Sequence, residues 1–199
     1  MKNEKQINQY LNEIKQICDE INHADIDKTI EILFDAWKNG NQVFLCGNGG
    51  SAGTATHFMC DLFKVTIVKD KKRFRAHCLN DNIPLMTALI NDDGWDNLFI
   101  EQLKNLYRKG DVILCFSVHG GSGCDKAGAW SQNLLKAMDY VKQNGGKTIG
   151  FAGYDGGAMK EIVDVCIVVP FNATPHVEAF HVVLQHLIAF RLKEKIAEY

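Results

Sequence analysis

A strand, a glycine-rich loop and a helix follow one another between residues 42 and 63, and no other segment restricts the fold as much. Residues 42–46 form a short apolar run of strand length. Gly-Asn-Gly-Gly follows at 47–50, and Ser51 stands where the N-cap of a helix over 52–63 is expected. Unhindered backbone N–H groups at a helix start bind anions, and the helix dipole favours negative charge. The segment therefore predicts an anion-binding loop after a buried strand.

Strand-like and helical runs alternate along the rest of the chain, which predicts a parallel sheet covered on both faces. Further strands are expected over 73–79, 111–116, 147–151 and 165–169, and helices over 84–90, 95–107, about 126–143, 156–161 and 175–198, with a turn at 91–94. Two amphipathic helices over 4–22 and 24–37 precede the first strand. We expect an α/β fold, a three-layer sandwich around a five-stranded parallel sheet. A single domain over 1–199 would comprise an N-terminal helical hairpin (1–40) and an α/β core (41–199).

Length, charge and cysteine content limit the class of protein. The 199 residues suit one domain, and a net charge of −2 gives no reason to expect nucleic acid or an anionic membrane as a partner. No apolar run approaches the ~20 residues needed to span a bilayer, and the first residues lack the apolar core of a signal peptide. The seven cysteines include no C-x-x-C motif. We therefore expect a cytoplasmic protein with reduced thiols.

A second loop of small residues follows the apolar run at 111–116. Ligands of an open α/β sheet bind beyond the carboxyl ends of its strands, where both loops are expected to lie. The loops supply the hydroxyls of Ser51, Ser117 and Ser122, and their glycines allow close approach of backbone amides. A single loop of this kind is explained more simply as a tight turn that binds no ligand. Two loops on one sheet edge favour a phosphorylated small molecule.

A dinucleotide site is the rival interpretation, because residues 47–52 satisfy the pattern G-x-G-x-x-A. That match is weak when it stands alone. The acidic residue available after the second strand, Asp81, lies well beyond the ~20-residue spacing of the dinucleotide fingerprint. The second serine loop also has no role in such a site.

Two helices each carry a histidine and a carboxylate on one face. His57 and Asp61 are four residues apart, and Glu178 and His186 are eight apart on the last helix. Two imidazoles and two carboxylates suit a Zn²⁺ site. A histidine on an apolar helix is more often a core residue, and the spacing alone leaves that alternative open. His181 lies three residues after Glu178.

At these residues the chain resembles the sugar isomerase (SIS) domain family, and within it the phosphoheptose isomerases, or sedoheptulose 7-phosphate isomerases. The most specific part is Cys-Gly-Asn-Gly-Gly-Ser at 46–51 followed by His57, and residues 89–94 and 110–112 are also similar to the family. The similarity covers nearly the whole chain. It implies a flavodoxin-like SIS fold and an isomerase that converts sedoheptulose 7-phosphate to D-glycero-D-manno-heptose 7-phosphate through an enediol, for lipopolysaccharide or capsule synthesis.

The resemblance also implies which residues form the site. The sugar phosphate would be bound by Asn48, Gly49, Gly50, Ser51, Asp61, Asn91, Asp92, Ser117, Val118, His119, Ser122 and Glu178. His57, Asp61, Glu178 and His186 would hold Zn²⁺, and we assign Asp61 as the catalytic base and His186 as the acid. Active sites of the family form between subunits of a homotetramer, where the N-terminal hairpin would pack.

Three positions depart from the family pattern. Asp61 replaces a glutamate, Glu178 a glutamine ligand and His119 a serine. The two carboxyl changes bring the formal charge of the ligand set from −1 to −2, which favours tight metal binding. A carboxylate on zinc is a poorer proton acceptor, so Glu178 or His119 could share the role of base. The alternative function is non-catalytic: a sugar-phosphate sensor or an assembly factor of the kind that binds a replication initiator.

Overall fold

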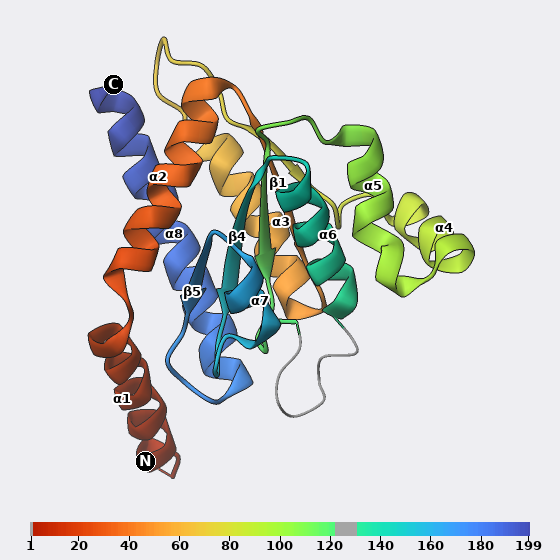
Figure 1. Cartoon of the computed structure of the whole chain (residues 1–199). Coiled ribbons are helices and arrows are strands. Elements are labelled where there is room, and N and C mark those ends of the chain that lie inside the picture. The colour runs from red at the N-terminus through yellow and green to blue at the C-terminus, as the bar shows by residue number, and fades with distance from the viewer. Residues whose placement is uncertain (1, 122–130) are drawn as a thin grey trace.

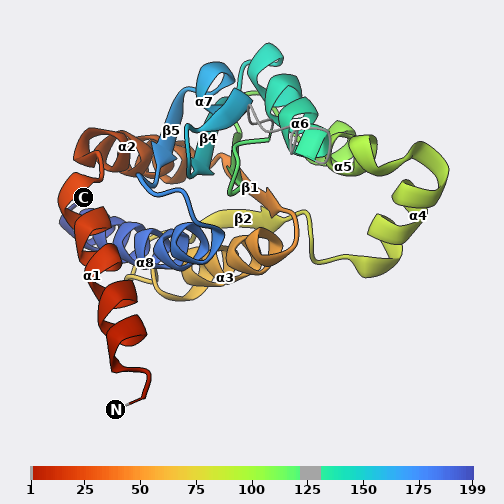
Figure 2. The same ribbon diagram turned by 90° about the horizontal axis from the view of Figure 1, so that it is seen from below.

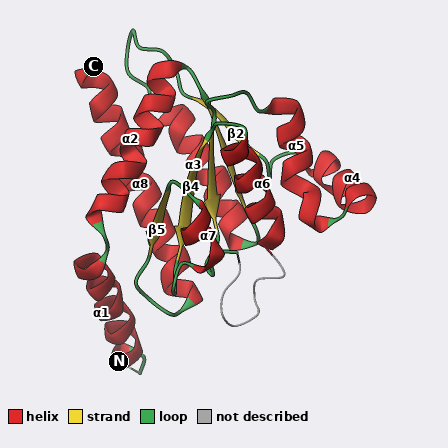
Figure 3. Ribbon diagram, viewed as in Figure 1, coloured by secondary structure: helices red, strands yellow, loops and turns green. Residues whose placement is uncertain are grey.

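The computed structural model describes residues 2–121 and 131–199, in which helices and strands alternate (Figures 1 and 3). The elements are α1 (Glu4–Glu20), α2 (His23–Asn39), β1 (Gln42–Gly47), α3 (Gly50–Lys64), β2 (Arg75–Cys78), α4 (Ile83–Asp93), the 3₁₀ turn η1 (Trp95–Asn97), α5 (Leu98–Leu106), β3 (Val112–Phe116), α6 (Gln132–Gln143), β4 (Lys147–Ala152), α7 (Gly157–Ile162), β5 (Val165–Val168) and α8 (Thr174–Glu198). Among these helices, none is long and apolar enough to cross a membrane.

The five strands form one parallel sheet in the order β2-β1-β3-β4-β5, which confirms the predicted α/β sandwich. Helices α2, α3 and α8 cover one face, and α5, α6 and α7 cover the other (Figure 2). The chain runs from β1 outward to β2 and then returns to β3 on the other side of β1. The carboxyl ends of β1 and β3 therefore flank the topological switch point, where ligands of such sheets bind.

Alternate side chains of the central strands pack into the two halves of the core. Val43 and Leu45 of β1 face α2, α3 and α8, whereas Phe44 and Cys46 face the opposite helices. Every residue of β3 is buried. Burial on both faces explains why these strands are apolar throughout, as a parallel sheet requires.

The two N-terminal helices are present, but they do not form the expected hairpin. Only Ile21 and Asn22 separate α1 from α2, and α1 does not lie back along α2 (Figures 1 and 2). Its middle contacts the start of α8 instead, where Glu13 Oε2 lies 2.9 Å from His176 Nε2 and the Tyr10 ring packs on the His176 ring. The apolar face of α2 is buried in the core formed with α3, α8 and the sheet, and the C-terminal end of α1 joins that core through Ile17. On α1, Ile17 is buried, whereas Ile7 and Leu11 are exposed.

Three local predictions differ from the structure. Ser51 is not an N-cap, because α3 begins at Gly50, two residues before the expected start, and Gly49 occupies the cap with φ 57° and ψ −126°, a conformation suited to glycine. Residues 91–93 are the end of α4, not a turn, and Gly94 terminates the helix. The expected helix over 95–107 is divided between η1 and α5. The described part of α6 begins at Gln132, and residues 126–130 lie outside the described ranges.

Candidate active site

Side-chain amides fix the loop between β1 and α3 from two sides. Asn80 accepts a hydrogen bond from the Gly47 N–H (3.1 Å) and donates one to the Gly47 carbonyl (3.0 Å). Asn48 and Asn133 exchange a reciprocal pair of amide hydrogen bonds, each 3.0 Å long. A Cβ on Gly47 would lie 2.5 Å from the Ser51 backbone, so only glycine fits there. The loop is therefore held in one conformation before any ligand arrives.

The loop after β3 is supported by the connection between β4 and α7. The Gly153 N–H donates to the Val118 carbonyl (2.9 Å), and the Met159 N–H donates to the Gly120 carbonyl (2.8 Å). A Cβ on Gly120, whose φ is 62°, would lie 1.9 Å from the Gly156 carbonyl oxygen. The Ser117 hydroxyl oxygen accepts from the Gly121 N–H at 3.1 Å, which leaves the hydroxyl able to donate to a ligand.

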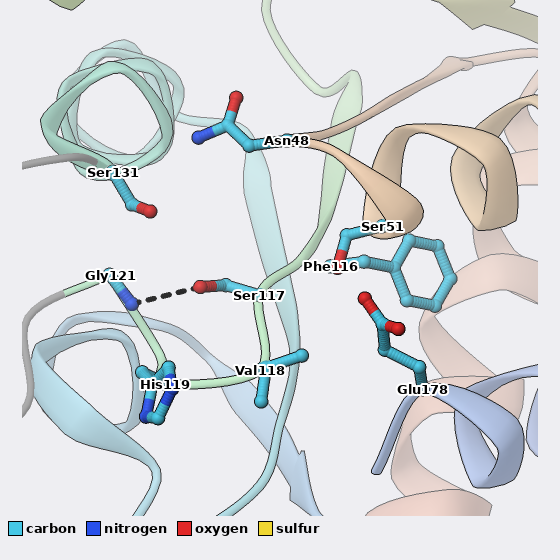
Figure 4. Close-up of a pocket in the computed structure, with 9 residues that line it drawn as sticks. All are labelled: Asn48, Ser51, Phe116, Ser117, Val118, His119, Gly121, Ser131 and Glu178. Atoms are coloured by element: carbon cyan, nitrogen blue, oxygen red, sulfur yellow. Dashed lines mark hydrogen bonds between the residues drawn. The ribbon is translucent and has the colours of Figure 1, made fainter. Parts of the chain in front are cut away.

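A pocket of about 180 Å³ lies between these two loops and the start of α8 (Figure 4). It is lined by Asn48, Ser51, Phe116, Ser117, Val118, His119, Gly121, Ser131 and Glu178. Six of these residues, all except Phe116, Gly121 and Ser131, were predicted to bind substrate. Ser131 was placed within a helix by the sequence pattern, and nothing in that pattern indicated that it would reach the pocket.

The other predicted substrate residues do not line the pocket, and Asp61 belongs to the cluster described below. Gly49 and Gly50 belong to the β1–α3 loop and the start of α3, where a Cβ on Gly50 would lie 2.5 Å from Glu178 Oε1. The missing side chain thus allows α8 to bring a carboxylate close to α3. Asn91 and Asp92 are exposed at the end of α4, away from the residues that line the pocket. Ser122 lies outside the described residues.

Three of the four predicted metal ligands come together between α3 and α8. His57, Asp61 and His186 each offer one ligand atom, and these atoms lie within 4.8 Å of one another. Asp61 Oδ2 is 3.1 Å from His186 Nδ1, and Asp61 Oδ1 is 3.9 Å from His57 Nε2. Glu178, two turns before His186, is not part of this cluster and lines the pocket instead.

The environment of Asp61 fits a cation. Its side chain is only 8% exposed, whereas those of His57 and His186 are 46% and 44% exposed and leave a path from solvent. Asp61 Oδ2 has no hydrogen-bond partner among the described residues, because the contact with His186 lacks hydrogen-bond geometry. A buried, unpartnered carboxylate oxygen is unfavourable unless a cation or donor satisfies it. One carboxylate and two imidazoles are ligands that zinc accepts.

His181 is a core residue, the alternative to a metal ligand that the sequence left open for a histidine on an apolar helix. It is fully buried on the core-facing side of α8, and its Nε2 lies 3.2 Å from the Ala152 carbonyl oxygen. Burial lowers the pKa of its imidazole to about 4, and the hydrogen bond with Ala152 acts in the opposite direction. His181 is therefore neutral at pH 7 and belongs to the core, not to the exposed cluster.

Comparison with known proteins agrees with this fold. The SIS domain family model matches residues 9–153, so the sheet and its two serine loops define a SIS domain. The phosphoheptose isomerase of Nitratiruptor sp. is 33% identical over 96% of both chains. The lincomycin biosynthesis protein LmbN of Streptomyces lincolnensis is 40% identical over 79% of this chain, but the match spans only 58% of its length. The chain therefore belongs to the SIS domain family, in its phosphoheptose isomerase branch.

Solved structures support the same assignment. The phosphoheptose isomerase GmhA from Neisseria gonorrhoeae matches with a TM-score of 0.83 and 25% identity, covering 96% of this chain and 98% of that one. A phosphoheptose isomerase from Francisella tularensis has the same fold, with a TM-score of 0.84, 22% identity, and coverage of 98% and 100%.

Proposed function

We propose that the protein is an aldose–ketose isomerase that converts sedoheptulose 7-phosphate to D-glycero-D-manno-heptose 7-phosphate. One observation carries this proposal: the same two helices link an anion-binding pocket to a carboxylate–histidine pair. On α3, Ser51 lines the pocket and Asp61 belongs to the metal-ligand cluster. On α8, Glu178 lines the pocket and His186 belongs to the cluster. The family assignment supports the same reaction. A cytoplasmic location and a role in lipopolysaccharide or capsule heptose synthesis remain predictions from the sequence.

The pocket suits the phosphate end of the substrate. The N-terminus of α3 and the hydroxyls of Ser51, Ser117 and Ser131 supply donors to a phosphate. The Glu178 carboxylate repels one, so the phosphate would lie on the side of the loops. Ten residues of α3 separate Ser51 from Asp61, or on the order of 15 Å along the helix axis. Side chains and an extended seven-carbon sugar phosphate together can span that distance.

The reaction needs two proton transfers at adjacent carbons. In our proposal the Asp61 carboxylate removes the proton next to the carbonyl group, and His186, whose Nδ1 lies 3.1 Å from Asp61 Oδ2, returns one. Each positioned proton transfer contributes roughly 10²–10⁴ in rate. Glu178 faces the pocket and is the second carboxylate within reach of the sugar.

Zinc is the metal we propose, with His57, Asp61 and His186 as ligands. When bound, it would polarise the carbonyl of the sugar as a Lewis acid. The residues themselves orient the substrate, because remote contacts with the phosphate supply binding energy that helps to align the reacting carbons.

We also propose that the protein is a homotetramer. Val183, Leu187 and Phe190 form an exposed apolar stripe along α8, and Ile7 and Leu11 form another on α1. Burying one phenylalanine side chain stabilises an interface by roughly 1.5–3 kcal/mol, and each symmetry-related copy of the interface gains the same amount.

We expect Phe190→Asp to give a smaller species by light scattering after gel filtration. Leu106→Asp, which changes an exposed leucine on α5, should leave the assembly intact; dissociation by both variants, or by neither, would contradict the proposed interface.

The function is tested by incubating zinc-loaded protein with sedoheptulose 7-phosphate and following both sugars by NMR. We expect the two heptose phosphates to interconvert. Unphosphorylated sedoheptulose is the matched control and should not react measurably, because it lacks the group that the pocket binds. Protein that binds the sugar phosphate and zinc but converts neither sugar would contradict the isomerase and support the non-catalytic alternative.

A further inference from the structure

His119 occupies the side of the pocket formed by the second loop, across from Glu178 (Figure 4). Its imidazole ring packs against the Tyr154 ring, with centroids 4.3 Å apart and a tilt of 36°. Tyr154 comes from the connection between β4 and α7 and is not itself a lining residue. A side chain outside the pocket thus contacts one that lines it.

The backbone around Tyr154 holds the ring in this place. Its φ of 54° is in the left-handed region, which is uncommon for residues other than glycine and persists only where the surroundings enforce it. The Tyr154 N–H donates to the Phe171 carbonyl at 3.3 Å. Three residues later, a Cβ on Gly157 would lie 2.2 Å from the His119 carbonyl oxygen. The connection that carries Tyr154 is therefore packed directly against the backbone of His119.

An imidazole at position 119 needs such support more than a serine does. A serine hydroxyl lies one bond beyond Cβ, whereas the imidazole nitrogens are farther away and their position depends on two rotatable bonds. An aromatic partner restricts those rotations and favours one ring position. An imidazole nitrogen can then donate a hydrogen bond to an anion at a defined point. Ser117, two residues earlier on the same loop, also has a hydroxyl able to donate there.

We infer that Tyr154 is a positioning residue that holds the His119 imidazole against the phosphate group of the substrate. The inference rests on the proposed function and specifies how this chain binds the phosphate where the family pattern has a serine. His119 donates to a phosphate oxygen, and Tyr154 acts only through His119. Because Glu178 lies across the pocket, the two sides of the pocket favour opposite ends of the substrate.

The test is a double-mutant cycle on the full-length protein, read out by calorimetric titration with inorganic phosphate and by steady-state kinetics. We expect His119→Ala to weaken phosphate binding by about 10-fold or more, as for loss of a charge-assisted hydrogen bond. Tyr154→Asn, which tolerates positive φ but lacks the ring, should weaken it by about 2- to 10-fold. Tyr154→Phe keeps the ring and should restore binding close to that of the wild type. Both weakening variants should raise KM more than they lower kcat.

The double variant separates a positioning role from a structural one. If Tyr154 acts through His119, adding Tyr154→Asn to His119→Ala should cause no further loss of phosphate affinity. Additive losses, or a Tyr154→Asn variant that binds phosphate like the wild type, would overturn the inference. So would unchanged phosphate affinity in His119→Ala. In those cases wild-type turnover of sedoheptulose 7-phosphate would still support the proposed function. A wild-type protein that binds neither phosphate nor sugar phosphate would contradict both the inference and the proposed function.

Discussion

Replacing Asp61 with asparagine is expected to lower kcat on sedoheptulose 7-phosphate by a factor of about 10²–10⁴. Asparagine keeps the shape of the side chain but can neither accept the proton nor bind a cation as a carboxylate does. Steady-state kinetics on the purified variant measures the effect. The substitution also removes a buried carboxylate oxygen that has no hydrogen-bond partner in the described part of the chain, so the metal-free variant should unfold at the same temperature as the wild type or higher.

Two further variants make this prediction specific. Asp61→Glu restores a carboxylate and should recover part of the activity lost in Asp61→Asn. Asp81→Asn changes an exposed aspartate that accepts a hydrogen bond from Thr56 of α3, and kcat should stay near that of the wild type. If Asp61→Asn keeps most of its activity while Glu178→Gln loses it, then Glu178 is the base and our assignment of Asp61 is wrong.

Removal of the metal is expected to have an effect of similar size. Dialysis against a chelator should abolish isomerisation, and added Zn²⁺ should restore it, because the remaining side chains alone cannot polarise the carbonyl to the same extent. Elemental analysis should find about one zinc per chain before dialysis, as expected for one ligand cluster. Full activity in protein that elemental analysis shows to be free of metal would contradict the zinc assignment.

Zinc binding can also be measured without the reaction. In calorimetric titrations, His57→Ala should lose more affinity than the ~10–100-fold typical of second-sphere changes, because His57 is a proposed ligand. His23→Ala is the matched control, since His23 is an exposed histidine at the start of α2, and its zinc affinity should not change. Equal zinc affinity in both variants would place the metal elsewhere.

The sheet could be predicted because its signals are local. Each strand is a short apolar run, and burial on both faces of a parallel sheet requires such runs. The position of α1 could not be predicted in this way. Its amphipathic pattern shows only that one face needs a partner; α2 buries its own apolar face in the core, and α1 contacts the start of α8 through Glu13 and Tyr10. The start of α3 was misplaced because it depends on the φ of Gly49 and not on the serine that follows.

The residues of the site were also predictable only in part. The positions of His57 and Asp61 on one face of α3 follow from helical periodicity, and the structure brings His186 to them. Asn133, Ser131 and Tyr154 had no such signal. Asn133 pairs with Asn48, which is 85 residues away in the sequence, and Tyr154 contacts His119 only because two loops pack together. Contacts of this kind depend on tertiary packing, which no local spacing encodes.

The central claim is that the serine-lined pocket and the His57–Asp61–His186 cluster act on one substrate molecule. A crystal structure with sedoheptulose 7-phosphate tests it most directly. We predict that the phosphate lies against Ser51, Ser117 and His119, with the carbonyl end of the sugar beside Asp61 and His186. A complex in which the phosphate binds outside the two loops, or in which the carbonyl end points away from the cluster, would contradict the account.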